Sequence, residues 1–469
     1  MIDKTIGNIH AQTGGSDMAV AKAGFVCFGE VNTPKEVIRR KSGEARALLE
    51  GAGIDLVYTD PVSDDPAGAD VARAVRELAR ESFDLLILCV AGWIPSHAVV
   101  AVLTPFRHMP ILLWGLTGWV EGGRLITTAD QAGTSALRKP MEDMGLKFRY
   151  FYEIYDKPVK MDRIIRYAKA CRAARLLQGA RIGQMGYRDM NLYGTMFDGV
   201  SLRGKIGIEM EFMEMLEMVQ RAEKASREDV QKVVAHIKKD WTFQKPAEPA
   251  TLEKGAAWYI AVRDKAKERG WQAVSLIDVD GFKKLLGFPP SMIFTLLSED
   301  PEICTVPEND SPGAVTQVMV RMLTGQIAAY FEFYEFMEDR VLIGVPDFVP
   351  REVVDGKLTV LPSRFGDFGE GILNVSKVKT GRVTLCRLTS KGESYSMHIV
   401  TGQAVTPRKW EECGWAPPAP QLPSLEVILD TPVEDFAQKV LSQHYILAYG
   451  DVTGELEELC RLLGVAVVR

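Results

Sequence analysis

The chain has 469 residues, of which 46% are hydrophobic and 25% charged, and its formal net charge at pH 7 is −6. This is the composition of a globular protein with roughly two to four packing units, and its interspersed charges exclude the basic patch typical of nucleic-acid or membrane-surface binding. No apolar run reaches the roughly 18 residues that span a bilayer, and no signal-peptide pattern opens the chain, so we expect a cytoplasmic protein without a membrane partner.

The first domain is predicted from alternating strand and helix patterns. Residues 1–22 are polar and contain glycine and serine, which indicates a flexible arm whose role the sequence does not give. Strand patterns follow at 23–31, 54–60, 83–92 and 109–118, with amphipathic helix patterns at 35–53, 68–82 and 95–106 between them. This alternation predicts a doubly wound α/β domain over residues 23–160. It contains no GxGxxG or GxxxxGK[ST] loop for a nucleotide phosphate.

Two further domains are predicted downstream. Residues 161–344 again combine helices with strand candidates, at 181–187, 271–279, 302–308 and 326–333, which predicts a second doubly wound α/β domain. Residues 345–469 alternate polar and apolar side chains at 382–390 and 394–405, as antiparallel strands do, and end in a helix, a strand and a helix. We therefore expect a β-rich C-terminal domain. The seven cysteines are dispersed without a CxxC pair, which favours reduced core residues.

The turn after the strand at 302–308 is the first candidate site. Glu308 follows Pro307 at the carboxyl end of this strand, where open α/β sheets place their ligands. Ser311 is predicted as the N-cap of the next helix and Gly325 as its stop. The structural alternative is that Glu308 only satisfies backbone amides at the helix N-terminus.

A second acid, Glu332, lies on the next strand, on the same face as Tyr330 and Tyr334. A β-α-β crossover would bring the carboxyl ends of the two strands together, so that Glu308 and Glu332 share one cleft. Such a pair can bind a hard cation through oxygen or move a proton. The alternative for Glu332 is a solvated strand face with tyrosines that only pack.

Three segments carry a resemblance to the L-fucose and L-arabinose isomerase family. The run PENDSPGAVTQVMVRMLTG resembles the family's E-x-D-x-x-G-A…L-T-G segment, AAYFEF is similar to its next strand, and HYILAYGDVTGELEELCRLLG resembles its closing segment. The order of elements also agrees along nearly the whole chain from Ala23. Residue by residue, the resemblance implies that Glu308 and Glu332 are the catalytic acid/base pair. It also implies that Glu308, Glu332 and His444 hold a divalent metal, with Mn²⁺ or Mg²⁺ the best match to these ligands.

Two further segments, GWIPSHAVVAVL and RIGQMGYRDM, resemble the family more weakly. This resemblance implies that Trp93 and Met190 are among the substrate-binding residues. The resemblance also implies a trimeric or hexameric homo-oligomer with sites between subunits, in which Trp93 lines another chain's site. The alternative for Trp93 is a core aromatic side chain.

The sequence departs from the family at three points. The stretch LIGVPDF lacks a histidine that the family often has after the second acid, and the second acid is glutamate, as in the arabinose enzymes. Lys283 replaces a substrate-binding glutamine of the fucose enzymes. A lysine near the mouth of the cleft would suit an anionic sugar, and the alternative is a solvated helix lysine.

The expected function is metal-dependent interconversion of an aldose and a ketose through a cis-enediol, acting on a monosaccharide or a modified monosaccharide. One carboxylate would move the carbon proton, the other the hydroxyl protons, and the metal would polarise the sugar oxygens. A related metal-assisted sugar epimerase and a non-catalytic sugar-binding protein remain as alternatives.

Overall fold

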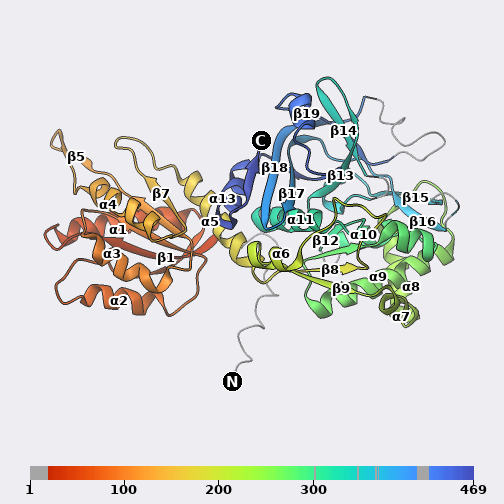
Figure 1. Ribbon diagram of the computed structural model, residues 1–469, viewed down its shortest axis with the longest axis horizontal. Helices are drawn as coiled ribbons and strands as arrows, with labels where there is room; N and C mark the ends of the chain where they lie inside the picture. Colours follow the sequence, from red (N-terminus) through yellow and green to blue (C-terminus); the bar gives the residue numbers. More distant parts are fainter. Residues whose placement is uncertain (1–19, 300–302, 346–347, 365–366, 368, 409–421) are drawn as a thin grey trace. The chain divides into compact units, whose positions relative to one another are not determined.

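The computed structural model describes residues 20–299, 303–345, 348–364, 367, 369–408 and 422–469 (Figure 1). The chain divides into two compact units, Met1–Arg175 and Leu176–Arg469. Within the described ranges, no helix has the length and apolar character needed to cross a membrane. The predicted arm at 1–22 falls almost wholly outside the described residues, as does Cys413. The six other cysteines are free and buried, which confirms the prediction of reduced core residues.

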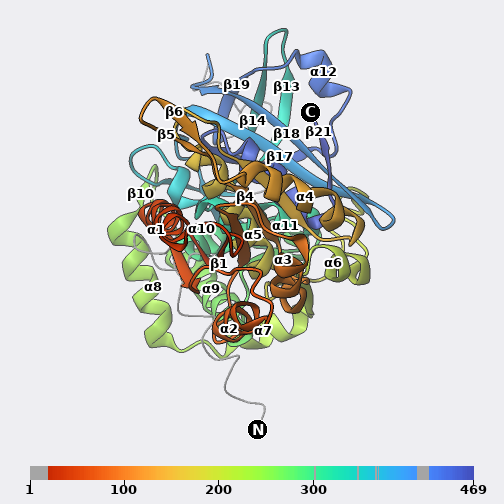
Figure 2. The same ribbon diagram turned by 90° about the vertical axis from the view of Figure 1, so that its left-hand side faces the viewer.

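The first unit is built on a five-stranded parallel sheet with the order β2-β1-β3-β4-β7. Its elements are β1 (Ala21–Phe28), α1 (Lys35–Gly51), β2 (Ile54–Tyr58), α2 (Ala69–Leu78), β3 (Leu85–Val90), α3 (Ser96–Leu103), η1 (Thr104–Phe106), β4 (Ile111–Gly115), β5 (Trp119–Glu121), β6 (Arg124–Ile126), α4 (Asp130–Asp143), β7 (Phe148–Tyr152) and α5 (Met161–Leu177). Strand β3 is buried along its whole length because helices lie on both faces of the sheet, with α1 on one side and α3 and α4 on the other (Figure 2). The predicted doubly wound pattern is confirmed here.

The second unit begins with a four-stranded parallel sheet of order β12-β11-β8-β9. This part contains β8 (Arg181–Met185), α6 (Gly199–Lys205), β9 (Glu209–Met213), α7 (Met215–Glu223), α8 (Arg227–Asp240), α9 (Pro249–Arg269), β11 (Ala273–Leu276), the π-helix η2 (Asp278–Leu285), α10 (Ser291–Glu299), β12 (Cys304–Val306) and α11 (Ser311–Thr324). A small sheet of β10 (Thr242–Phe243), β15 (Thr359–Arg364) and β16 (Glu370–Asn374) lies in the same unit, as does η3 (Arg351–Val353).

A barrel completes the second unit. In the described residues its sheet has the order β17-β20-β13-β14-β19-β18-β21, and the additional pairing of β17 with β18 closes it. The elements are β13 (Ala329–Phe336), β14 (Arg340–Gly344), β17 (Gly381–Lys391), β18 (Ser394–Val405), β19 (Ser424–Leu429), α12 (Val433–Ala437), β20 (His444–Tyr449), α13 (Thr453–Leu463) and β21 (Ala466–Val468). The molecule is thus a mixed α/β protein with parallel sheets and a C-terminal barrel region.

The crossover predicted between β12 and β13 is wrong. Strand β13 pairs antiparallel with β20 and β14 in the barrel, whereas β12 pairs with β11 in the parallel sheet. Ala329 and Phe331 of β13 enter the barrel core, and Tyr330 and Glu332 alternate with them toward the other face, where Tyr330 is also buried. The physical reason for the difference is that β13 is one strand of a closed barrel, so its neighbours are set by the barrel and not by the strand that precedes it in the sequence. The domain boundaries 23–160, 161–344 and 345–469 remain predictions.

Candidate active site

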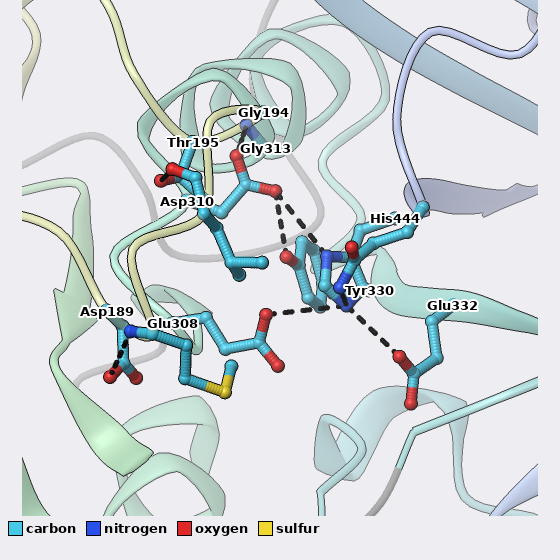
Figure 3. Close-up of polar contacts among 12 residues, drawn as sticks. Asp189, Gly194, Thr195, Glu308, Asp310, Gly313, Tyr330, Glu332 and His444 are labelled. Atoms are coloured by element: carbon cyan, nitrogen blue, oxygen red, sulfur yellow. Dashed lines mark hydrogen bonds and ion pairs between the residues drawn. The ribbon is translucent and has the colours of Figure 1, made fainter. Parts of the chain in front are cut away.

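The candidate site lies where three parallel strands of the second unit end. The loop after β8 carries Asp189 and Met190, Asp278 follows β11, and Glu308 follows β12. Because parallel strands present their carboxyl ends at one edge of a sheet, these side chains gather at the position where α/β proteins bind ligands. Figure 3 shows Asp189 and Glu308 at this edge and Glu332 and His444 opposite them.

Glu308 is held in an unusual backbone conformation. Its φ is +61° and that of the next residue, Asn309, is +51°. Left-handed conformations cost non-glycine residues roughly 1–2 kcal/mol each, so two in succession need support from their surroundings. The amide of Glu308 donates to Asp278 Oδ1 at 2.9 Å, and Asn309 Nδ2 donates to the carbonyl of Met185 at 2.7 Å. The turn that aims Glu308 is therefore anchored to the ends of β8 and β11.

The barrel supplies the other two predicted ligands on neighbouring strands. Glu332 on β13 and His444 on β20 are directly opposite each other in the strand register. His444 Nε2 lies 3.5 Å from Glu332 Oε2 and 3.7 Å from Glu308 Oε2 (Figure 3). The side chain of Glu332 is 16% exposed, which excludes a solvated strand face. The structure therefore brings Glu308, Glu332 and His444 together, although by a different topology from the one predicted.

Asp310 is an acid of a different kind. It is fully buried and forms a two-point ion pair with Arg387 of β17, with Nη2 2.8 Å from Oδ1, while Tyr330 Oη donates to its Oδ2 at 2.8 Å. Burial opposes its ionisation, but Arg387 outweighs burial and holds the pKa of Asp310 below its usual value. Tyr330 in turn stacks on His444, with ring centroids 4.5 Å apart. Asp310 thus orients the ring of His444 through Tyr330.

Asp310 is also the N-cap of α11, because its side chain accepts the amide of Gly313 at 3.0 Å. The predicted N-cap was Ser311, one residue later, so that prediction is wrong. Gly325 ends the helix as predicted, with φ +78°.

Glu308 has no compensating cation in the protein alone. Burial, with Asp278 and Glu332 nearby, raises the pKa of its carboxyl to about 9. Its Oε2 is buried without a hydrogen-bond partner, and so is Oε1 of Glu332. A buried charged oxygen without a donor is costly, and a bound cation would satisfy both of these atoms.

The donor set fits a divalent metal. Two carboxylates and one imidazole suit Mn²⁺ or Mg²⁺, and each acid offers an oxygen that lacks a protein partner. Among the described residues, no group of His, Cys, Asp or Glu side chains already stands at the spacing of a formed metal site. Glu308 and Glu332 would therefore have to turn their carboxylates toward a bound ion.

The predicted substrate residues lie in different places. Trp93 follows β3 in the first unit and is 40% exposed, which excludes the alternative of a core aromatic. Met190, at φ +46°, lies in the loop after β8 and is 36% exposed. Lys283 is 3% exposed and paired with Asp278 at 3.1 Å, so it is not a solvated lysine. Contact of these three with a sugar remains a prediction.

Sequence reasoning missed the residues that support the three central side chains. Tyr330 was considered only as a packing residue, and neither Asp278 nor Arg387 was singled out. Arg387 is 77 residues from its partner Asp310. The one available signal was an arginine between the apolar residues Cys386 and Leu388 of β17, which indicates a buried partner.

Comparisons with known proteins relate the chain to sugar isomerases. The family described as L-fucose isomerase, C-terminal domain, matches residues 369–469, which include His444 and Arg387. A sulfoquinovose isomerase from Alkalicoccus urumqiensis is 21% identical over 77% of this chain and 80% of its own length, and one from Priestia aryabhattai is 22% identical over 78% and 81%. The chain is thus similar to the fucose isomerase-like sugar isomerases. This isomerase is therefore an enzyme that interconverts an aldose and a ketose.

Solved structures add little. A solute-binding protein of an ABC transporter from Burkholderia multivorans covers 66% of the isomerase and 95% of its own chain, at 9% identity and a TM-score of 0.17. A score that low does not indicate a shared overall fold.

Proposed function

We propose that the isomerase uses Glu308 and Glu332 as its acid/base pair and holds a divalent cation with these two acids and His444. The observation that carries the proposal is the convergence of the three side chains, with His444 Nε2 within 3.7 Å of both carboxylates. The buried, partnerless oxygens Glu308 Oε2 and Glu332 Oε1 support it, because they mark where positive charge is needed. A sugar-binding protein without chemistry would have no use for such a costly pair.

The two acids can carry out every proton transfer of the reaction. One carboxylate removes the proton from C2 of the open-chain aldose while the other carboxylic acid donates a proton to the carbonyl oxygen O1. The product of this step is a cis-enediol. The second carboxylate then takes the proton of the O2 hydroxyl, and the first acid returns its proton to C1, which gives the ketose. A divalent cation supplies Lewis-acid polarisation of O1 and O2 when it is bound.

His444 has a positioning part in this scheme. Its ring is stacked on Tyr330, whose hydroxyl is fixed by Asp310, and Asp310 is fixed by Arg387. An imidazole held in this way keeps one orientation, and orientation of a ligand by its outer partners is worth roughly 10–100-fold in affinity or activity. The first unit presents Trp93 on its surface, and we propose that it contacts the sugar in a homo-oligomer.

The names of the relatives support a proposal for the substrate class. Both relatives are named as sulfoquinovose isomerases, so we propose that an anionic aldose of this kind is the substrate. The neutral sugars L-fucose and L-arabinose represent the wider family and serve as comparison.

The test is a product screen with metal-stripped protein. The isomerase is treated with EDTA, dialysed and incubated with each aldose, with and without added Mn²⁺ or Mg²⁺, and ketose is detected by NMR. We expect ketose from sulfoquinovose only with added metal. Full activity of the stripped protein would contradict the metal site, and an epimeric aldose in place of a ketose would show that the acids return the proton to the opposite face.

A further inference from the structure

A buried ion pair lies directly behind the backbone of Glu308. Asp278 and Lys283, both on the π-helix η2, are each 3% exposed in their side chains and lie 3.1 Å apart. The two oxygens of Asp278 have separate partners: Oδ2 accepts from Lys283 Nζ, and Oδ1 accepts from the amide of Glu308 at 2.9 Å. The carboxylate therefore connects a buried cation with the backbone of the proposed acid/base.

The bond to Glu308 falls where the chain most needs support. Glu308 and Asn309 adopt successive left-handed conformations, which side-chain-bearing residues avoid. The second residue of the turn is held by the Asn309 amide, which donates to the carbonyl of Leu276 at 3.2 Å, and by the Asn309 side chain on Met185, whereas Asp278 accepts the amide of the first residue. The direction of the Glu308 side chain over the sheet edge depends on the first of these residues.

We propose that Asp278 is a positioning residue that sets the Glu308 carboxylate against Glu332 and His444, with Lys283 as the cation that keeps Asp278 in place. This deepens the proposed function and rests on it. Asp278 does not itself handle a proton of the sugar: one of its oxygens is taken by Lys283 and the other by the Glu308 amide. Its effect passes through the backbone of Glu308, because a relaxed turn would carry the carboxylate away from the other two ligands.

The competing explanation is that the ion pair only supports the fold, as buried pairs elsewhere in the chain do. Asp84 offers a matched control. It is 3% exposed, accepts a backbone amide from Lys22 at 2.8 Å and is paired with Arg175, so its carboxylate also joins a cation to a backbone amide, in the first unit. Removing Asp84 therefore also separates a cation from a backbone amide without touching Glu308, although Arg175 is half-exposed and regains water more easily than the buried Lys283 does.

The experiment compares Asp278→Ala, Asp278→Asn/Lys283→Met and Asp84→Ala with the wild-type isomerase. In the double variant the side-chain oxygen of the introduced asparagine can still accept the Glu308 amide, and the buried charge of Lys283 is removed with its partner. Three quantities are measured: Mn²⁺ affinity by calorimetry without sugar, kcat and KM, and deuterium exchange of the peptide that contains Glu308 in the metal-free protein. Thermal unfolding of each variant is followed alongside.

For Asp278→Ala we expect Mn²⁺ affinity and kcat to fall by roughly 10–100-fold, KM to change little, and the Glu308 amide to exchange faster. The double variant should recover most of the lost affinity, and Asp84→Ala should lower only the unfolding temperature. The proposal is overturned if Asp278→Ala behaves as Asp84→Ala does, or if the double variant is no better than the alanine variant. If the wild type binds no metal and turns over no sugar, the proposed function fails, and exchange at Glu308 still decides whether Asp278 holds its backbone.

Discussion

Each parallel sheet of the molecule is followed by a buried acid, Asp130 in the first unit and Glu308 in the second. The two acids differ in whether the chain supplies a cation beside them. In the first unit, Asp130 at the start of α4 is 1% exposed and forms a buried ion pair with Lys41 of α1. In the second unit, the groups that act most strongly on Glu308 are other acids, led by Asp278 and Glu332. The first arrangement is complete within the chain, whereas the second leaves negative charge that burial makes expensive.

The contrast separates a structural acid from a functional one. A buried carboxylate with its own lysine contributes to a stable fold and has little capacity left for a ligand. A buried carboxylate among acids is destabilised until a cation or a proton arrives, and this is the condition that binds a metal or moves a proton. Mutations at the site and pH titration can test whether Glu308 is such a functional acid.

The largest effect is expected from the three central side chains. Glu308→Gln, Glu332→Gln and His444→Ala should each lower kcat by roughly 10²–10⁴-fold or more, because each removes a metal ligand and two of them remove an acid/base group. Glu335→Gln is the matched control, since Glu335 lies on the same strand but is exposed. Mn²⁺ titration should show weaker Mn²⁺ binding in the three variants and unchanged Mn²⁺ binding in Glu335→Gln. Unchanged turnover in any of the three would remove that residue from the site.

The pH dependence of the metal-free protein should reveal that Glu308 has no compensating cation. A carboxyl whose pKa rises from 4.5 to about 9 on folding favours the folded state while it stays protonated. This contribution is fully present below pH 4.5 and is lost as pH rises through about 9. We therefore expect the free energy of unfolding of the metal-free protein to fall over this window by on the order of a few kcal/mol more in the wild type than in Glu308→Gln.

Saturating Mn²⁺ should reduce this difference, because the cation replaces the proton as the neutralising partner of Glu308. Urea unfolding at several pH values, with and without metal, measures both effects. If the free energy of unfolding without metal depends on pH in the same way in the wild type and in Glu308→Gln, ionisation of Glu308 costs the folded state nothing. Glu308 would then not differ from Asp130 in the way described above.

The sequence was sufficient for the local elements and insufficient for the pairing of distant ones. Strand β3 was predictable because a continuous apolar run between turn residues has few other uses, and Gly325 because a helix needs a residue that tolerates positive φ. The neighbour of β13 was not predictable from adjacent elements: the partner strand β20 is more than 100 residues away, and antiparallel pairing with it is decided by the whole barrel. Glu308, Glu332 and His444 were identified through a resemblance, whereas Asp278 and Arg387 act through contacts with residues that are distant in the sequence.

A moderate effect is expected from Trp93. Its side chain is 40% exposed on the first unit, and a large exposed aromatic side chain is suited to pack on a sugar or a partner. Trp93→Ala should raise KM by about tenfold, which corresponds to a loss of roughly 1.4 kcal/mol of sugar binding. The affinity for Mn²⁺ should not change. Mixing Trp93→Ala subunits with Glu308→Gln subunits tests the predicted sharing of sites: some sites of the hetero-oligomers should combine the intact Trp93 of one chain with the intact Glu308 of another and show the wild-type KM, which neither variant shows alone. An active monomer at assay concentration would exclude a shared site.

The smallest effect on turnover is expected from substitution of Lys283. The result distinguishes between two roles of this residue, contact with the substrate and support of Asp278. The sequence predicts a contact with an anionic sugar, while the structure pairs Lys283 with Asp278, which in turn binds the amide of Glu308. Since its charge is already matched by Asp278, we expect Lys283→Gln to lower kcat by up to about tenfold for sulfoquinovose and for a neutral aldose alike, through the loosened turn at Glu308. Lys284→Gln is the control, because the neighbouring Lys284 is half-exposed and bonded to Asp280. A selective rise of KM for the anionic sugar by tenfold or more, equivalent to about 1.5–3 kcal/mol, would instead make Lys283 a direct contact of the substrate's anionic group.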